Sequence, residues 1–272
     1  MDDQIIAIYC LCDDVLKAFD HYEDPQRQMS DAEVMTTAVV AAMHFRGNLE
    51  RAREWLSNAG YIPRMLGKSR FNRRLHAIGE LFLTVFQVLG EQFKQLNTTS
   101  VYVIDSFPIA ACDNIRIPRA RLYQEEAYRG YIASKRRYFY GLRIHLLVTA
   151  NGEPVEVFLA PGADADVRAL HRFNFDLPTG STIYGDSAFT HYLVEDLMRE
   201  AGLSLQPIRK QNSKRPVPPY LAYLQAKGRK IVETTGSLIE RLLPKSIHAV
   251  TARGFELKVM LFVLACSLSF VI

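Results

Sequence analysis

The sequence predicts a mixed α/β protein with a central sheet and flanking helices, preceded by a helical region. Three observations support this. No β-rich run occurs between Gln4 and Gln95, where apolar residues recur at helical spacing. From Thr99 onward, short strand-like runs alternate with helical segments. Asn151-Gly152 stands between two strand-like runs, which is a strong hairpin signal. We therefore expect a helical N-terminal region over residues 1–97 and an α/β domain over residues 98–272.

The N-terminal region contains three stretches with helical periodicity. They cover residues 2–19, 33–45 and 75–93. Ser30 followed by Glu33 forms an S-x-x-E capping box, which predicts where the second helix begins.

The second region reads as strand, hairpin, helix, strand, helix, strand and a final helical region. A helix over 163–175, capped by Asp164 or Asp166, is expected after the hairpin. The expected strands are 100–105, 137–150, 154–160, 181–186 and 203–208. A second helix is expected over 187–202. The apolar tail, residues 259–272, is shorter than the roughly 17 to 25 residues that span a bilayer, so we expect a buried helix.

Composition excludes several classes of protein. The four cysteines form no C-x-x-C pair or zinc ladder, so neither a zinc site nor a disulfide framework is expected. The acidic N-terminus is unlike a signal peptide, and a cytoplasmic location without membrane association fits best. The net charge of +4 is modest, but its distribution is uneven.

Two aspartates end apolar strand-like runs. Asp105 follows "VYVI" and Asp186 follows "STIYG". Each has an ordinary alternative, since Asp105 could cap a turn and Asp186 could cap a helix. If the two strands are parallel neighbours, the carboxylates lie side by side and need a cation between them. Oxygen ligands without Cys or His nearby favour Mg²⁺ or Mn²⁺.

Four segments in order resemble the DDE transposases of bacterial insertion sequences, with the strongest likeness to the insertion sequence 982 group. They are "VIDSFPIAAC", "ASKRRYFYGLRIHLLVTANGEPVEVFLAPG", "IYGDSAF" and "RKIVETTGSLIERL", within residues 98–245. The resemblance implies an RNase H-like catalytic domain. It also implies that Asp105, Asp186 and Glu233 form the catalytic and metal-binding triad, with the glutamate on a helix after the two strands.

The third acid rests on an R-x-x-x-E signature, present as Arg229 and Glu233. Ala226 and Glu240 stand where the family has tyrosine and lysine. Glu240 is therefore an alternative third acid. For either glutamate, a solvated helix face paired with Lys or Arg is the ordinary alternative.

The resemblance also implies two Mg²⁺ ions per site, with Mn²⁺ possible, and cleavage and joining of DNA strands. The expected partners are double-stranded DNA, as element ends and target, and further copies of the chain, since two ends are processed together. Two alternatives remain open: a nuclease of the same fold that never transfers strands, and an inactive DNA-binding derivative.

Three basic stretches are candidate DNA contacts. Residues 209–230 hold seven Lys and Arg but no acid, residues 129–143 interleave basic and aromatic residues, and a basic helix is expected to begin near Lys68. A solvated surface loop is the alternative for the first stretch, and an ordinary amphipathic helix with an outward basic face is the alternative for the third. The candidate DNA-binding residues are Lys135, Arg136, Arg137, Arg209, Lys210, Lys214, Arg215, Arg229, Lys230, Arg70, Arg73 and Arg74.

Two other polar residues have ordinary explanations. Ser106 lacks a G-x-S-x-G turn, so its hydroxyl is expected to bond to nearby backbone. His145 alternates with apolar neighbours and is expected to be a satisfied core or sheet-face histidine.

Overall fold

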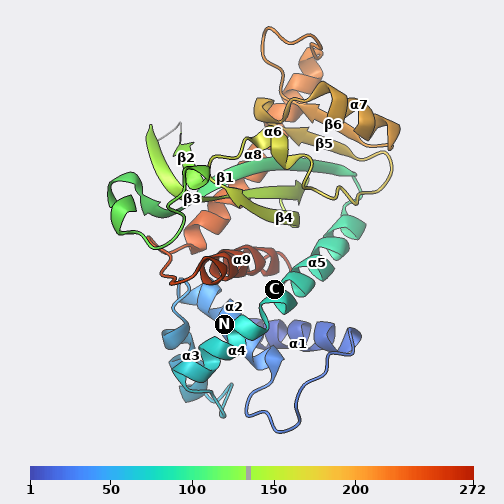
Figure 1. Cartoon of the computed structure of the whole chain (residues 1–272). Helices are drawn as coiled ribbons and strands as arrows, with labels where there is room; N and C mark the ends of the chain where they lie inside the picture. Colours follow the sequence, from blue (N-terminus) through green and yellow to red (C-terminus); the bar gives the residue numbers. More distant parts are fainter. Residues whose placement is uncertain (133–135) are drawn as a thin grey trace. The chain divides into compact units, whose positions relative to one another are not determined.

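A computed structural model describes residues 1–132 and 136–272, with the backbone alone for 113–116 (Figure 1). The chain forms two compact units. The helical unit comprises Met1–Leu89 and Leu238–Ile272, and the sheet unit comprises Gly90–Ser237. These units do not coincide with the regions 1–97 and 98–272, because the last helix packs against the N-terminal helices.

The helical unit confirms the first two predicted helices. The capping box of Ser30 and Glu33 is present, with both reciprocal hydrogen bonds. The predicted single helix over 75–93 is wrong, because the chain breaks at Ile78 into two helices. One helix of this unit, at 49–58, was not predicted. The helices of the N-terminal part are α1 (Asp2–Ala18), α2 (Asp31–His44), α3 (Leu49–Asn58), α4 (Lys68–Ala77) and α5 (Gly79–Leu96).

The core of the helical unit forms around α2 and α9 (Ala252–Leu268), which pack against each other. Both helices are apolar on most of their circumference, as expected of helices surrounded by others. The predicted buried helix at the end of the chain is thereby confirmed. Over the described part of the chain, no helix has the length and apolarity needed to cross a membrane.

The sheet unit contains a six-stranded mixed sheet, which confirms the predicted fold class. The central strand β1 pairs antiparallel with β3 and parallel with β5, which is parallel to β6. Strands β2 and β4 both pair with β3. The strands are β1 (Val101–Asp113), β2 (Arg129–Ile132), β3 (Arg137–Thr149), β4 (Pro154–Pro161), β5 (Thr182–Gly185) and β6 (Ser204–Pro207).

The predicted hairpin is confirmed between β3 and β4. Asn151 and Gly152 form the turn, and Gly152 has φ +94°, a conformation that favours glycine. The prediction that β1 ends at Asp105 is wrong, since the strand continues to Asp113. It does so because the long β3 remains its partner, as far as the pair Asp113 and Phe139.

The predicted helix over 163–175 is reduced to the single turn α6 (Asp166–Ala169). Neither candidate cap acts there, because α6 has no side-chain cap and the Asp166 carboxylate accepts a hydrogen bond from Ser106 instead. The predicted helix over 187–202 is divided. A 3-10 turn, η4 (Ser187–Phe189), precedes α7 (Tyr192–Glu200). Two further 3-10 turns are η1 (Asn114–Arg119) and η2 (Glu126–Tyr128).

Helix α8 (Pro219–Leu242) has proline at its first position, where the missing N–H costs nothing. Within the sheet unit, α8 covers one face of the sheet. A Cβ added to Gly228 would lie 3.3 Å from Val103 Cγ2 and 3.2 Å from Tyr184 Cδ2. The Gln225 amide donates to the backbone carbonyls of Gln206 and Pro207 at the end of β6. This helix therefore lies directly over β1, β5 and β6.

Candidate active site

The sheet brings Asp105 and Asp186 together. Ile104 of β1 pairs with Gly185 of β5 in parallel register, and the two aspartates are the next residues on each chain. The prediction of parallel neighbouring strands is thereby confirmed. Both aspartates line one small pocket, whose other polar residues are Gln225 and Arg229 of α8. Asp105 thus lies where β1 loses its parallel neighbour, rather than at the end of its own strand.

Strand alternation directs Asp105 toward α8. Successive side chains of a strand point to opposite faces, so Val103, Asp105 and Phe107 share a face. Val103 lies beneath Gly228, and Phe107 lies within 4 Å of a Cβ built at Gly236, both on α8. Asp105 is therefore enclosed between the sheet and the helix.

The enclosure changes the acidity of Asp105. Burial raises its pKa to about 6, while a hydrogen bond from the Ser106 N–H lowers it. The carboxylates of Asp186 and Asp166 raise the pKa further, and the Arg229 guanidinium lowers it. Two carboxylates that face the same pocket repel each other, so this site is stabilised by positive charge.

Arg229 supplies that charge. Its Nη1 lies 3.8 Å from Asp186 Oδ1, and its Nε donates to Glu233 Oε1 at 2.7 Å. The hydrogen bond to Glu233 and the nearby aspartates raise the pKa of Arg229. One guanidinium thus joins the second and third acids of the predicted triad.

The predicted third acid is less enclosed than the aspartates. Glu233 is exposed on α8, and its ion pair with Arg229 is the ordinary helix-surface pairing that the sequence left open. Glu240 is also exposed, on the part of α8 that belongs to the helical unit. Asp186 also has the capping role that was its ordinary alternative. Its carboxylate accepts a hydrogen bond from the Ser187 N–H at 2.5 Å and caps η4.

The donor chemistry of the aspartate pair fits a divalent cation. Two oxygen ligands on neighbouring strands, beside a positive side chain, are the ligand type that Mg²⁺ and Mn²⁺ prefer. Across residues 1–132 and 136–272, however, no three Asp, Glu, His or Cys side chains converge closely enough to hold a metal ion. The fit therefore rests on Asp105 and Asp186, with Glu233 held by Arg229.

A second polar cluster lies on the other face of β1. The Ser106 hydroxyl donates to Asp166 Oδ1 at 2.5 Å and accepts from Arg143 Nη1 at 3.1 Å. Arg143 Nη1 also lies 3.7 Å from that Asp166 oxygen. The expectation of a local backbone bond for Ser106 is therefore wrong. Sequence reasoning missed this cluster, because its three residues come from separate elements, β1, β3 and α6, that only the fold brings together.

His145 lies beside this cluster and is fully buried. Its ring stacks on Phe158 with the centroids 4.8 Å apart, and neither ring nitrogen has a hydrogen-bond partner in the described part of the chain. Burial, with the charges of Arg143 and Arg172, lowers its pKa to about 3. His145 is therefore a neutral core histidine, as expected, but not a hydrogen-bonded one.

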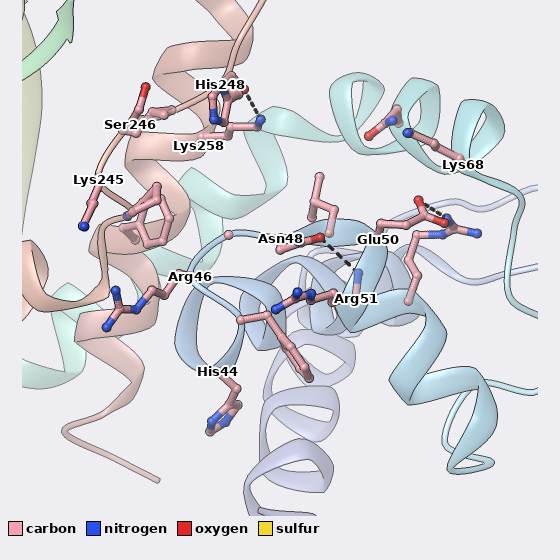
Figure 2. Close-up of a pocket in the computed structure, with 18 of the residues that line it drawn as sticks. His44, Arg46, Asn48, Glu50, Arg51, Lys68, Lys245, Ser246, His248 and Lys258 are labelled. Atoms are coloured by element: carbon pink, nitrogen blue, oxygen red, sulfur yellow. Dashed lines mark hydrogen bonds and ion pairs between the residues drawn. The ribbon is translucent and has the colours of Figure 1, made fainter.

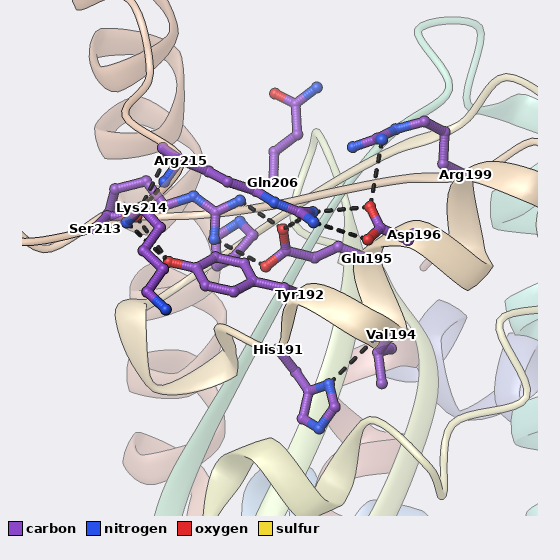
Figure 3. Close-up of polar contacts among 12 residues, drawn as sticks. His191, Tyr192, Val194, Glu195, Asp196, Arg199, Gln206, Ser213, Lys214 and Arg215 are labelled. Atoms are coloured by element: carbon purple, nitrogen blue, oxygen red, sulfur yellow. Dashed lines mark hydrogen bonds and ion pairs between the residues drawn. The ribbon is translucent and has the colours of Figure 1, made fainter.

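The predicted DNA-binding residues near the acids divide into paired and unpaired groups. Arg209 forms a bidentate ion pair with Glu195, with distances of 2.8 and 2.6 Å. Arg215 does the same with Asp196, at 2.8 Å for both bonds (Figure 3). Both acids lie on α7. These two arginines therefore fix the loop after β6 to α7.

Three other predicted DNA-binding cations of this stretch are solvent-exposed. Lys210 and Lys214 lie on the loop, and Lys230 on α8. None of the three has an ion-pair partner within the residues that the structure describes. Since α8 begins at Pro219, the second half of the stretch 209–230 is helical.

The other two predicted surfaces are only partly described. Lys135 lies outside the described residues, and Arg136 and Arg137 are exposed beside it. Nearby, the exposed rings of Tyr131 and Tyr138 lie 4.9 Å apart.

On α4, Arg70 and Arg73 are exposed, whereas Arg74 pairs with Asp31 at 2.6 Å and lies near Glu23. Arg74 therefore joins α4 to the start of α2.

Comparisons with known proteins show the family of the chain. The family described as "Transposase DDE domain" matches residues 95–246. Among solved structures, the chain is similar to a piggyBac transposase in a synaptic complex with hairpin DNA. The identity is 11% and the TM-score 0.47, over 97% of this chain and 72% of that one. No curated protein matches the sequence. Because the family match covers more than half of the chain, including the β1 and β5 aspartates and the α8 glutamate, the chain belongs to the DDE transposases.

Proposed function

We propose that this DNA transposase cleaves DNA at the ends of an insertion sequence and transfers the strands to a target, using Asp105, Asp186 and Glu233. We further propose that it belongs to the bacterial insertion sequence 982 group. The observation that carries the proposal is the placement of Asp105 and Asp186 at adjacent positions on parallel strands, facing one pocket. The family match over this segment supports it.

Asp105 and Asp186 would hold the divalent metal, with Glu233 completing the site and two ions, Mg²⁺ or Mn²⁺, occupying it. When bound, such ions supply activation of water or a 3′-hydroxyl and neutralise charge on the phosphate. The chain's own contribution is to keep two oxygen ligands adjacent, one enclosed by α8 and one at the end of β5. Arg229 reduces the repulsion between the acids in the metal-free protein.

The acidity of Asp105 sets a lower pH limit for this role. With a pKa of about 6, its carboxylate is mostly ionised at pH 7 and becomes protonated as the pH falls below 6. A protonated carboxyl group is a poor ligand for a divalent cation. We therefore expect activity to fall as the pH drops through this value.

The DNA would contact exposed positive charge near the acids. Lys210, Lys214 and Lys230 are exposed and without ion-pair partners in the described residues, so each can approach a phosphate. We propose that residues 98–272 carry catalysis and that residues 1–97 contribute to binding of the element ends. We also propose that the chain works as a homo-oligomer, because both ends of an element must be processed together.

One observation favours a second candidate. The Glu233 carboxylate is engaged in an ion pair with Arg229. In addition, the described residues contain no group of three acids that could hold a metal ion. This arrangement suits a derivative that binds DNA without cutting it. A nuclease that cleaves but never transfers strands would use the same acids and is separated from the transposase by its products.

The test is cleavage and joining of a labelled DNA that carries the element's own ends, in Mg²⁺ and in Mn²⁺. Wild type is compared with Asp105→Asn, Asp186→Asn, Glu233→Gln and Glu240→Gln, each checked for folding by circular dichroism. We expect the first three to lower the rate by at least about 10³-fold, equivalent to about 4 kcal/mol, and Glu240→Gln to leave it within about twofold.

Each other outcome has a definite reading. Cleavage without joined products would support the nuclease. Binding by wild type without cleavage in either metal would support the inactive derivative. Loss of activity in Glu240→Gln, with Glu233→Gln active, would move the third acid to Glu240.

A further inference from the structure

A large pocket lies within the helical unit and includes the first turns of α4. Its volume is about 1100 Å³, above the roughly 300 to 1,000 Å³ of small-molecule sites. It is lined by the end of α2, the turn into α3, the start of α4, and the segment from Pro244 to Phe262 (Figure 2). Two parts of the chain some 200 residues apart in sequence thus form one surface. We call it the basic pocket.

The lining carries a strong excess of positive charge. Glu50 is the single acid among the described lining residues, and its carboxylate is already paired with Arg53 at 2.7 Å. The lining cations are Arg46, Arg51, Arg53, Lys68, Lys245 and Lys258, with His44 and His248 beside them.

Four of these cations are available to a ligand. Arg53 donates to the Leu66 carbonyl as well as to Glu50, and Lys258 Nζ donates to the His248 carbonyl, so both are engaged. The side chains of the other four have neither an ion pair nor a hydrogen bond with any described residue, and all four are exposed. They are Arg46, Arg51, Lys68 and Lys245.

The turn between α2 and α3 holds one of these cations in a constrained backbone. Arg46 has φ +49° and Gly47 has φ +76°, so two successive residues adopt the left-handed conformation. A Cβ at Gly47 would lie 2.7 Å from Phe262 Cζ, which shows how closely the turn packs on α9. This conformation is unfavourable for a non-glycine residue, and the packing of the turn on α9 maintains it at Arg46.

The cations are spread around the pocket rather than gathered on one point. Figure 2 shows Arg46 and Lys245 on one side and Lys68 on the other. Such spacing suits a ligand with repeated negative charges better than a single small anion. A nucleic acid backbone presents charges of this kind.

We propose that the basic pocket binds the sugar-phosphate backbone of double-stranded DNA. This inference rests on the proposed function, since it assigns a second DNA contact to the same enzyme. The contact is independent of base sequence, because positive side chains neutralise phosphates without reading base edges. It shares Lys68 with the α4 helix that the sequence suggested, but none of the three α4 arginines lines it.

The salt dependence of DNA binding tests the proposal. Full-length protein is titrated into a fluorescent duplex without divalent metal, from 50 to 200 mM KCl. The test variant is Arg46→Ala/Arg51→Ala/Lys245→Ala. The charge-matched control is Lys17→Ala/Arg64→Ala/Arg121→Ala, which removes three exposed cations outside the pocket. A charge-retaining variant, Arg46→Lys/Arg51→Lys/Lys245→Arg, checks for structural damage, and melting curves confirm folding.

The expected result is a smaller salt slope for the test variant alone. Three lost phosphate contacts reduce the slope of log K against log[salt] by about 2.7, so the affinity advantage of wild type shrinks about 40-fold between 50 and 200 mM salt. The charge-retaining variant keeps the wild-type slope. An unchanged slope in the test variant, or an equal decrease in the control, overturns the inference.

Two further outcomes separate the causes of failure. Potassium phosphate replaces KCl at equal ionic strength in a parallel titration. If phosphate displaces DNA more strongly than KCl does at the same ionic strength, the pocket is a site for small anions, and the assignment to DNA is overturned. If wild type binds no DNA at all, the proposed function fails together with this inference, whereas wild-type binding with an unchanged variant slope overturns the inference alone.

Discussion

The two basic regions of this transposase differ in what their cations contact. In the sheet unit, Arg209 and Arg215 form bidentate pairs with two acids of α7, and Arg229 bridges two acids of the predicted triad. In the helical unit, the basic pocket holds four cations without described partners. Density of positive charge in a sequence therefore does not indicate which cations are free to bind phosphate.

The difference arises from tertiary structure. The stretch 209–230 contains no acid of its own, which made it the strongest candidate for DNA contact. Its acids come from α7, which precedes it in the chain and packs against β6. The basic pocket instead gathers its cations from several separate segments of the chain.

The largest expected stability effect tests whether the paired arginines are structural. The Glu195 side chain is 2% exposed, so Glu195→Gln leaves the Arg209 guanidinium buried beside a neutral partner. We expect a loss of about 3 to 5 kcal/mol in the free energy of unfolding. Asp196→Asn is the matched control, because that carboxylate is 40% exposed and solvent screens its pair with Arg215, so a much smaller loss is expected.

Urea denaturation followed by circular dichroism measures both. Equal effects of the two substitutions would contradict the assignment of a buried, structural pair. A gain in DNA affinity in Glu195→Gln, with stability unchanged, would show instead that Arg209 is available to DNA.

The next prediction concerns the turn that fixes the basic pocket. Gly47→Ala combines a left-handed backbone with a contact of 2.7 Å to Phe262. We expect a loss of about 2 to 3 kcal/mol, from about 1 to 2 kcal/mol of backbone strain with overpacking in addition. Gly60→Ala is the control, because Gly60 has φ +81° but no atom within 4 Å of the added Cβ.

Thermal denaturation of both variants separates strain from packing. Similar losses for Gly47→Ala and Gly60→Ala would show that the contact with Phe262 relaxes at little cost. The turn would then be a less rigid support for Arg46 than the geometry indicates.

The smallest expected effect concerns pH. His145 has a pKa of about 3 in the folded protein, below the 6.5 of an exposed histidine. The unfolded chain therefore binds more protons than the folded chain between these values, so stability is lost as the pH falls from 6.5. Between pH 7.5 and 5.5 this costs about 1.4 kcal/mol.

His145→Leu should remove this dependence. We compare the change in the free energy of unfolding from pH 7.5 to 5.5 for the variant and for wild type, by urea denaturation. The variant should lose about 1.4 kcal/mol less than wild type. Equal pH dependence in the two proteins would contradict a buried, neutral His145.

Much of the sheet and of the aspartate pair could be predicted from the sequence. Apolar runs ending in Asp105 and Asp186 indicated two buried strands, and strand register then placed the carboxylates together. The Asn151-Gly152 turn was equally clear, because its chemistry is local. Features set by nearby residues were thus predicted well.

Features that depend on distant partners were not. The extension of β1 beyond Asp105 depends on the length of β3, and the shortening of the helix near Asp166 goes with its hydrogen bond to Ser106. The pairing of Arg209 with α7 likewise follows from the fold rather than from any local pattern. Periodicity cannot report which side chains a fold brings together.

The most direct test of the central claim is binding of Mn²⁺ to the metal-free protein at pH 7.5, followed by electron paramagnetic resonance and calorimetry. Wild type is compared with Asp105→Asn, Asp186→Asn and the control Glu240→Gln. The account predicts that wild type and Glu240→Gln bind Mn²⁺ and that each aspartate variant weakens binding at least about tenfold. Binding by both aspartate variants as tight as that of wild type would contradict the claim that Asp105 and Asp186 form the metal site.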